Sequence, residues 1–318
     1  MTNDKSISPD EDARLKNLHE YNIMDTSPEI IFDEITELAS EILQCPVSFI
    51  QFMDEDKIDL AAHFIARGRL GPSLIPRPPD DFIPKNVFDG YAVQAEVNRI
   101  LKMAKLGPVV GHKIGCTTNV MQKFLEIDHP CAGEIFDSTV YSSKTELSLS
   151  KFSHVGVECE IAVRIGSDML GLKGPFTPES VRRSVNAIMA GIELVDDRYE
   201  DYKQLNAPTL IADNFFNVGV VLGEELKNWQ NLNLQSISGI LKLDGIEISK
   251  GHGADILGNP FEALAWIANH RAKLGVPILA GSFVMLGSVV QTVFIEKPCR
   301  IDIEFNGLAP VGVTFTKS

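Results

Sequence analysis

The chain has 318 residues, a formal net charge of −14 and 44% hydrophobic residues. This length is enough for one large domain or two small ones, and the composition is that of an ordinary globular protein. The acidic charge argues against nucleic acid and against an anionic membrane as partners, because both attract basic surfaces. No stretch approaches the apolar length of a membrane span.

The cysteines indicate a reducing compartment. They are scattered, and none forms a C-x-x-C pair: Cys45, Cys116, Cys131, Cys159 and Cys299. An odd number without such spacing is typical of free thiols in a cytoplasmic protein. The first residues are polar and acidic, so we expect no signal peptide and a cytoplasmic location.

The N-terminal region is predicted to be an extension of the main body. Residues 1–12 are expected to form a disordered tail. Pro28 starts a predicted helix, residues 46–53 are predicted as a strand, and residues 54–57 as a turn.

Part of this extension resembles a known domain. The stretch L-H-E-Y-N-I-M-D-T-S-P-E-I-I-F-D-E-I, followed by P-V-S-F-I-Q-F-M-D-E-D-K, resembles the opening of a GAF sensor domain. The resemblance stops near Ile58, before most of the ligand pocket of a complete GAF domain. We therefore expect a truncated GAF-like extension over residues 13–58, packed on the main body or on a neighbouring subunit, without small-molecule sensing.

Three further segments precede the chemically informative part of the chain. Residues 60–68 are predicted as a short helix. Residues 71–84 contain five prolines and are predicted as a linker or an extended arm. Residues 88–106 are predicted as a helix that Gly107 and Pro108 end.

Residues 157–165, V-E-C-E-I-A-V-R-I, alternate between apolar residues and a second set that includes two glutamates. This alternation predicts a strand with one buried face, and it places Glu158 and Glu160 together on the other face, roughly 7 Å apart. Two carboxylates so close repel each other unless a cation or a shared proton lies between them. A divalent ion bound by oxygen ligands is the simplest resolution. The alternative is a solvated strand face on an acidic protein.

Lys113 lies among small residues in the stretch 109–118. Small neighbours let the backbone approach a ligand closely, so Lys113 could clamp an anion or, if desolvated, carry a proton with a lowered pKa. The alternative is a lysine in solvent at the end of a strand. Residues 127–133 follow, after a short predicted helix, as a loop that could cover a site.

A third carboxylate is predicted after residue 189. Residues 178–189 are predicted as a helix with Thr177 as its N-cap. The segment 190–199 then combines an apolar run with Glu193, two aspartates and Arg198. A third acid here would complete a three-oxygen metal site. The alternative is a strand end in which Arg198 pairs locally.

The remainder of the chain is predicted to be rich in strands. Residues 217–222 are predicted as a strand and 240–250 as a hairpin around Asp244-Gly245, a strong turn signal. Asn259 and Pro260 start a predicted helix. Further strands are predicted at 278–280, at 283–290 and within 299–315.

Seven motifs, taken in chain order, resemble one family: G-H-K-I-G-C-T-T, I-D-H-P-C-A-G, V-E-C-E-I-A, G-I-E-L-V-D-D-R-Y, A-D-N, G-N-P-F-E-A-L-A-W-I-A and A-G-S-F-V-M-L-G-S. The family is the 2-keto-4-pentenoate hydratase / 4-oxalocrotonate decarboxylase group of the fumarylacetoacetate hydrolase superfamily, and the resemblance runs from about Ala61 to the C-terminus. It implies an α+β fold, a mixed β-roll with flanking helices, and a hydratase-like catalytic domain over residues 59–318.

The resemblance also implies the site residues. They are Glu158, Glu160 and Glu193 as ligands of Mg²⁺ or Mn²⁺, Lys113 and Arg198 as catalytic residues, and Gly287 and Ser288 close to the substrate carboxylate. Relatives of this kind are usually homo-oligomers, so we expect a homo-oligomer that acts on a small-molecule 2-oxo acid.

The reaction expected from the resemblance is hydration of an unsaturated 2-oxo acid such as 2-hydroxypenta-2,4-dienoate to a 4-hydroxy-2-oxo acid, in aromatic-compound catabolism. One position departs from the family, because Cys131 stands where hydratases usually carry an acid. Asp128 and Glu134 are the nearby acids that could replace it. The alternatives are decarboxylation of an oxalocrotonate-like acid, C–C hydrolysis of an acylpyruvate, and a non-catalytic regulatory protein on a degenerate hydratase body.

Overall fold

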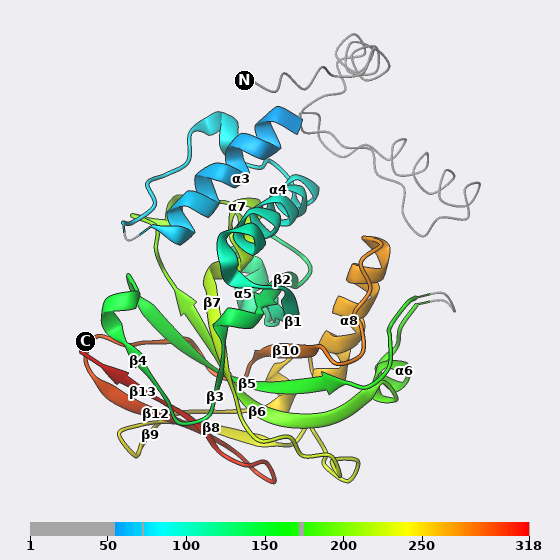
Figure 1. Ribbon diagram of the computed structural model, residues 1–318. Coiled ribbons are helices and arrows are strands. Elements are labelled where there is room, and N and C mark those ends of the chain that lie inside the picture. Colours follow the sequence, from blue (N-terminus) through cyan, green and yellow to red (C-terminus); the bar gives the residue numbers. More distant parts are fainter. Residues whose placement is uncertain (1–54, 72, 172–174, 318) are drawn as a thin grey trace.

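The computed structural model describes residues 55–317 apart from residue 72 and residues 172–174. The predicted tail at 1–12 and nearly all of the GAF-like segment lie outside these described residues. No helix in the described part is both long enough and apolar enough to cross a membrane. The described residues form two sheets with helices around them, and most of the strand pairs are antiparallel (Figure 1). This arrangement confirms the predicted α+β class.

The larger sheet has eight strands and carries the residues of interest. Its order is β2-β1-β10-β5-β6-β7-β3, and β11 pairs with β5. Only the β1–β10 and β3–β7 pairs are parallel. The strands are β1 (Val109–Gly115), β2 (Cys131–Phe136), β3 (Val140–Ser142), β5 (Val155–Ile165), β6 (Val185–Asp196), β7 (Asn217–Leu222), β10 (Phe283–Ser288) and β11 (Val293–Phe294).

The smaller sheet has five strands in the order β4-β13-β12-β8-β9. They are β4 (Thr145–Ser148), β8 (Ser238–Leu243), β9 (Ile246–His252), β12 (Cys299–Phe305) and β13 (Val311–Thr316). The predicted hairpin is confirmed, because β8 and β9 pair around Asp244 and Gly245. Both turn residues have positive φ, 49° and 81°, as a two-residue hairpin turn requires.

Helices flank the larger sheet. They are α3 (Glu55–Leu70), α4 (Val87–Leu101), α5 (Asn119–Phe124), α6 (Pro178–Arg182), α7 (Ala207–Ala212) and α8 (Pro260–Lys273). Figure 1 shows α3, α4 and α7 together on the side of β5 and β6 that faces away from the five-stranded sheet. Side-chain caps start several of them. The Asn86 side chain accepts from the Asp89 amide at α4, and the Asn259 side chain accepts from the Phe261 amide at α8.

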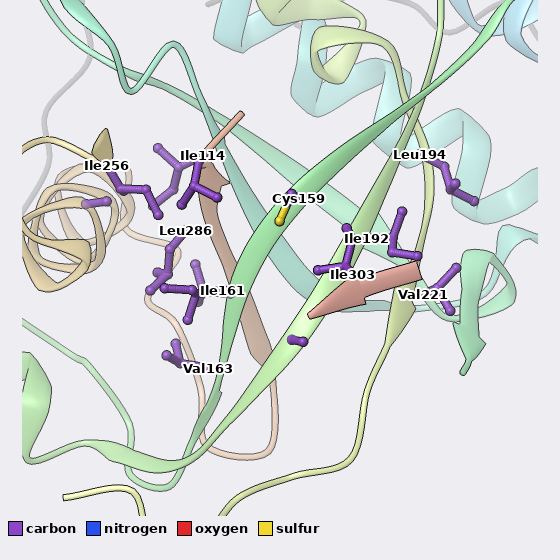
Figure 2. Close-up of a cluster of buried hydrophobic side chains, with 14 of the residues drawn as sticks. Ile114, Cys159, Ile161, Val163, Ile192, Leu194, Val221, Ile256, Leu286 and Ile303 are labelled. Carbon is purple, nitrogen blue, oxygen red and sulfur yellow. The ribbon is translucent and has the colours of Figure 1, made fainter. Parts of the chain in front are cut away.

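The main core lies between the two sheets. Apolar side chains of β5 and β6, among them Cys159, Ile161 and Ile192, are buried together with side chains of β12 such as Ile303 (Figure 2). The other face of β5 is buried as well, because Ala162 packs with Met189, Val220 and Met285 in a second cluster. The prediction of a single buried face on this strand was therefore wrong. Alternation identified the strand, but both of its faces are covered.

Three predicted elements differ from the structure. The strand predicted at 278–280 is absent, and Ile278 makes only an isolated bridge with Met169. The predicted helix at 178–189 ends at Arg182, and strand β6 begins at Val185. The run that follows is apolar, so its periodicity does not separate helix from buried strand, and pairing with β5 along nearly its whole length decides for strand. The predicted turn at 54–57 is the first turn of α3 from Glu55 onward, and α3 crosses the predicted domain boundary after residue 58.

Candidate metal and substrate site

Three carboxylates meet on β5 and β6. Glu158 of β5 lies directly opposite Glu193 of β6 in the antiparallel register, and Glu160 follows two residues later on the same side of β5. One carboxylate oxygen from each of the three lies within 4.8 Å of the others. The two glutamates of the E-x-E strand and the third acid predicted from the sequence are thus brought together as one cluster.

The hydrogen bonds of these carboxylates leave two buried oxygens without a partner among the described residues. Glu160 Oε2 accepts from the Gly287 amide at 2.9 Å, and Glu193 Oε1 accepts from Asn217 Nδ2 at 2.9 Å. Glu158 Oε1 accepts from the Thr292 hydroxyl. Glu160 Oε1 and Glu193 Oε2 are buried and have no hydrogen-bond partner among the described residues. Buried carboxylate oxygens without donors are costly, so the cluster fits an oxygen-preferring divalent cation.

Burial and mutual repulsion both act on the acids. Burial raises the pKa of Glu158 and raises that of Glu160 well above its ordinary value. The Glu193 carboxylate adds to both shifts, and Glu158 adds to that of Glu160. Three ionised groups in this arrangement need positive charge nearby, and the charge that the protein itself supplies is Lys113.

Lys113 lies on β1 with its side chain almost fully buried. Its Nζ is 3.1 Å from Glu193 Oε1 and 5.6 Å from the centre of the Phe215 ring. Burial alone would lower the pKa of Lys113, but Glu193, Glu158 and Glu160 outweigh it, and the net pKa is raised. Lys113 is therefore an ammonium group held by carboxylates. Without a bound cation, the pKa of Lys113 is thus raised, unlike the sequence-based idea of a desolvated lysine with a lowered pKa.

Glycine makes room for this lysine. A Cβ at Gly133, the residue opposite Lys113 on β2, would lie 3.0 Å from Lys113 Cγ. The small residues noted in the sequence on either side of the site therefore allow close approach of the lysine side chain.

Gly287 and Ser288 lie at the end of β10 beside Glu160. The Gly287 amide holds Glu160, and its φ of 110° requires glycine. The Ser288 hydroxyl accepts from the Cys159 amide at 3.1 Å and donates to the Val290 carbonyl at 2.8 Å. The structure places both residues next to the carboxylates, and their contact with a substrate stays a prediction.

Arg198 lies in a different set of contacts. It is buried, and its Nη2 donates to the Phe216 carbonyl at 3.4 Å. Burial and the nearby Arg69 lower its pKa, while Asp213 opposes this shift. The described residues show no hydrogen bond or ion pair between Arg198 and the three glutamates, and its catalytic role stays a prediction.

Cys131 is fully buried at the start of β2, opposite Gly115, so the predicted covering loop ends three residues earlier than expected. Its thiol hydrogen-bonds to that of Cys116, which lowers the pKa of Cys116 and raises that of Cys131 well above the usual range. Of the two possible replacement acids, Asp128 is exposed. Glu134 is paired with Arg271 at 2.7 Å and accepts from Asn98 at 2.9 Å.

Sequence reasoning missed three residues that hold the cluster: Asn217, Thr292 and Arg69. Asn217 follows three residues after the A-D-N motif, which was noted only as one of the motifs of the family resemblance. Thr292 and Arg69 carry no local signal, because each acts on residues more than a hundred positions away.

Comparisons with known proteins identify the family and the fold. Residues 118–316 match the family "Fumarylacetoacetate (FAA) hydrolase C-terminal", so the chain belongs to that family. Among curated relatives, a 2-keto-4-pentenoate hydratase of Burkholderia vietnamiensis is 33% identical over 71% of this chain and 85% of that protein. A 4-oxalocrotonate decarboxylase of Pseudomonas sp. (strain CF600) is 27% identical over 83% of this chain and 98% of that protein.

A solved structure shows the same fold. The 4-oxalocrotonate decarboxylase from Pseudomonas putida G7, complexed with magnesium and adipate, superposes with a TM-score of 0.78 at 24% identity, over 84% of this chain and all of that chain. The predicted family and its fold are thereby confirmed. The GAF-like resemblance of the N-terminal segment stays a prediction.

Proposed function

We propose that this protein is a metal-dependent hydratase that adds water to an unsaturated 2-oxo acid, such as 2-hydroxypenta-2,4-dienoate, and yields a 4-hydroxy-2-oxo acid. The observation that carries the proposal is the buried cluster of Glu158, Glu160 and Glu193 with two oxygens that lack partners. The names of the curated relatives supply the reaction. The setting in aromatic-compound catabolism follows the sequence-based resemblance.

The three glutamates would hold Mg²⁺ or Mn²⁺. Three protein oxygens leave coordination positions for a substrate carboxylate and 2-oxo oxygen. A bound divalent ion would supply Lewis-acid stabilisation of negative charge on the substrate. Glu160 and Glu193 are oriented for this by the donors on their other oxygens, the Gly287 amide and the Asn217 side chain.

Lys113 would act on the substrate directly. Its ammonium group carries a proton and lies 3.1 Å from a metal-binding carboxylate, so it can stabilise developing negative charge or deliver a proton from Nζ. Gly287 and Ser288 are adjacent to Glu160 and would border the substrate carboxylate. Arg198 would contribute indirectly, through the Phe216 carbonyl that it contacts. We also place the protein in the cytoplasm as a homo-oligomer, following the sequence-based expectation.

The test is hydration of 2-hydroxypenta-2,4-dienoate, followed by loss of its ultraviolet absorbance. Activity is expected with Mg²⁺ or Mn²⁺ and not with a chelator. Glu160→Ala should abolish it, whereas Glu179→Ala, which removes an exposed carboxylate paired with Arg183, should not. Lack of turnover on every 2-oxo-dienoate tested, with metal present, would remove the hydratase proposal.

Decarboxylation of an oxalocrotonate-like acid is the second candidate. Cys131 favours it, because the thiol is buried with a raised pKa where hydratases usually carry an acid, while Asp128 is exposed to solvent and Glu134 is paired with Arg271. Release of CO₂ would identify this reaction, and formation of pyruvate from an acylpyruvate would identify C–C hydrolysis. Metal binding without turnover on all three substrate classes would indicate a non-catalytic protein.

A further inference from the structure

We propose that Arg69 is a positioning residue that clamps the turn of residues 213–217 and, through this turn, sets the orientation of Glu193 and the place of Lys113. The inference rests on the proposed function, since it concerns a glutamate assigned to the metal. Arg69 belongs to α3, which precedes the residues matched by the family domain. Helix α3 would therefore be part of the machinery of the site.

One guanidinium group joins the two ends of the 213–217 turn. Arg69 Nη1 donates to the Asp213 carbonyl at 2.6 Å and to Asp213 Oδ1 at 2.8 Å. Arg69 Nη2 donates to the Asn217 carbonyl at 2.7 Å. The side chain is only 6% exposed. The two Nη atoms of the planar guanidinium reach Asp213 and Asn217 separately, whereas the single nitrogen of a lysine would have to reach both residues from one point.

The turn needs such a clamp, because its backbone is strained. Asn214, Phe215 and Phe216 have φ values of 53°, 47° and 63°, a left-handed conformation that residues other than glycine rarely adopt. Three such residues in succession persist only where the surroundings hold them. Arg198 supplies a second hold, through its bond to the Phe216 carbonyl.

The turn also has contacts on the α4 and β2 side. Asn214 Nδ2 donates to Asn98 Oδ1 at 2.7 Å, and Asn214 Oδ1 accepts from the Glu134 amide at 3.0 Å. These bonds hold the middle of the turn, and Arg69 holds its two ends, Asp213 and Asn217.

Two side chains of the turn held by Arg69 lie at the site, those of Asn217 and Phe215. Asn217 donates to Glu193 Oε1, the same oxygen that contacts Lys113 Nζ. Because Asn217 and Lys113 both contact Oε1, Glu193 Oε2 has no partner and is available to the metal. Phe215, in the middle of the turn, places its ring 5.6 Å from Lys113 Nζ. If the clamp opened, Asn217 would no longer hold the carboxylate in this orientation.

Loss of Arg69 should not leave Asp213 without a positive neighbour, because Arg198 lies close enough to interact with it. The experiment is titration of purified protein with Mn²⁺ by calorimetry. The wild type is compared with Arg69→Lys, Arg69→Met, Asn217→Ala and the double variant Arg69→Lys/Asn217→Ala. Arg164→Met is the matched control, because Arg164 also bonds one carboxylate, Glu225, and one carbonyl, that of Gly281.

The expected result is weakening of Mn²⁺ binding by about 10-fold to 100-fold in each single variant, as for other residues that orient metal ligands. The double variant should bind Mn²⁺ no more weakly than the single variant with the lower Mn²⁺ affinity, because both changes break the same chain of contacts. Arg164→Met should bind Mn²⁺ within about twofold of the wild type even where its melting temperature falls. The electron paramagnetic resonance spectrum of bound Mn²⁺ should change in Asn217→Ala and not in Arg164→Met.

Unchanged Mn²⁺ affinity in Arg69→Lys and Asn217→Ala, with a wild type that binds Mn²⁺, would overturn the inference and leave the proposed function standing. Additive losses in the double variant would overturn it too. A wild type that binds no Mn²⁺ would instead remove the proposed metal site. If Arg69→Met does not fold, Arg69→Lys and Asn217→Ala decide the question.

Discussion

Glu158 and Glu193 occupy the same rung of the antiparallel β5–β6 ladder, so two carboxylates face each other across a buried strand pair. Like charges directly opposite in a sheet are destabilising, and burial makes them more so. The protein offsets this with Lys113 on the neighbouring side of the site. The first three of the following predictions, on the pH dependence of Mg²⁺ stabilisation, on Glu160→Gln and on Lys113→Met, follow from this excess of buried negative charge.

Stabilisation by Mg²⁺ should increase with pH. Glu158 and Glu160 have raised pKa values, so between their unfolded values near 4.5 and their higher folded values the folded, metal-free protein binds more protons than the unfolded chain. Its stability therefore falls as pH rises through this window. Mg²⁺ replaces those protons and removes the penalty.

The measurement is the difference in melting temperature between Mg²⁺-loaded and chelator-treated protein from about pH 5 to about pH 8. It should grow steadily with pH. A melting-temperature difference that stays constant or shrinks as pH rises would mean that Mg²⁺ does not replace protons on Glu158 and Glu160. Glu160→Gln provides a comparison in which the difference between Mg²⁺-loaded and chelator-treated protein should be absent over the whole pH range.

Glu160→Gln should stabilise the metal-free protein and abolish its response to Mg²⁺. A neutral amide keeps an acceptor for the Gly287 amide and removes one buried charge, which is worth about 1–3 kcal/mol. The check is thermal unfolding with chelator and with Mg²⁺. Glu304→Gln, at a half-exposed ion pair with Lys242, should leave the Mg²⁺ response as it is in the wild type.

Lys113→Met should lower turnover by about 10²-fold to 10⁴-fold while Mn²⁺ binding persists or becomes tighter. Among the described residues, Lys113 supplies the ammonium group that pairs with these carboxylates, so its removal strengthens the attraction between the carboxylates and Mn²⁺. Without metal the variant should lose about 3–5 kcal/mol of stability, because Glu193 is left buried without its partner. Turnover is measured under saturating metal, and Lys242→Met serves as the control. Weaker Mn²⁺ binding in Lys113→Met would contradict this account of the charges.

Gly287→Ala should destabilise the protein and weaken metal binding together. A Cβ there would lie 2.6 Å from Thr117 Cγ2, and the φ of 110° is unfavourable for alanine, so a cost of about 2–4 kcal/mol is expected. The resulting shift also moves the amide that holds Glu160. Gly281→Ala has a φ of 88° and no atom within 4 Å, so it carries the strain without the clash and should keep its Mn²⁺ affinity.

Cys116 should be the first of the four described cysteines to react with iodoacetamide. It is partly exposed, and the hydrogen bond from the Cys131 thiol lowers its pKa, so its thiolate is present at lower pH than in an ordinary cysteine. Peptide mapping of the modified sites against time and pH gives the order. Cys131→Val removes the hydrogen bond and should slow the reaction of Cys116 at neutral pH, and an unchanged rate would show that the bond has no effect.

Local sequence patterns correctly predicted part of this structure. Alternation located the strand of Glu158 and Glu160, and Asp244-Gly245 located the β8–β9 turn. The resemblance placed Glu193 and Lys113 with these glutamates, and the structure brings them together. The helix predicted at 178–189 failed, because an apolar run has no period that separates a helix from a strand buried on both faces.

The amino-acid sequence by itself determined the family, the α+β class and the three acids, because these depend on residue types and on spacing along the chain. Only the tertiary structure decided which buried carboxylate oxygens lack a partner and that Lys113 pairs with these carboxylates. It also decided that Arg69 bonds the turn whose Asn217 holds Glu193. The reason is physical. Burial, the pKa of a buried group and hydrogen bonds between residues more than a hundred positions apart depend on packing in three dimensions, and no local pattern encodes them.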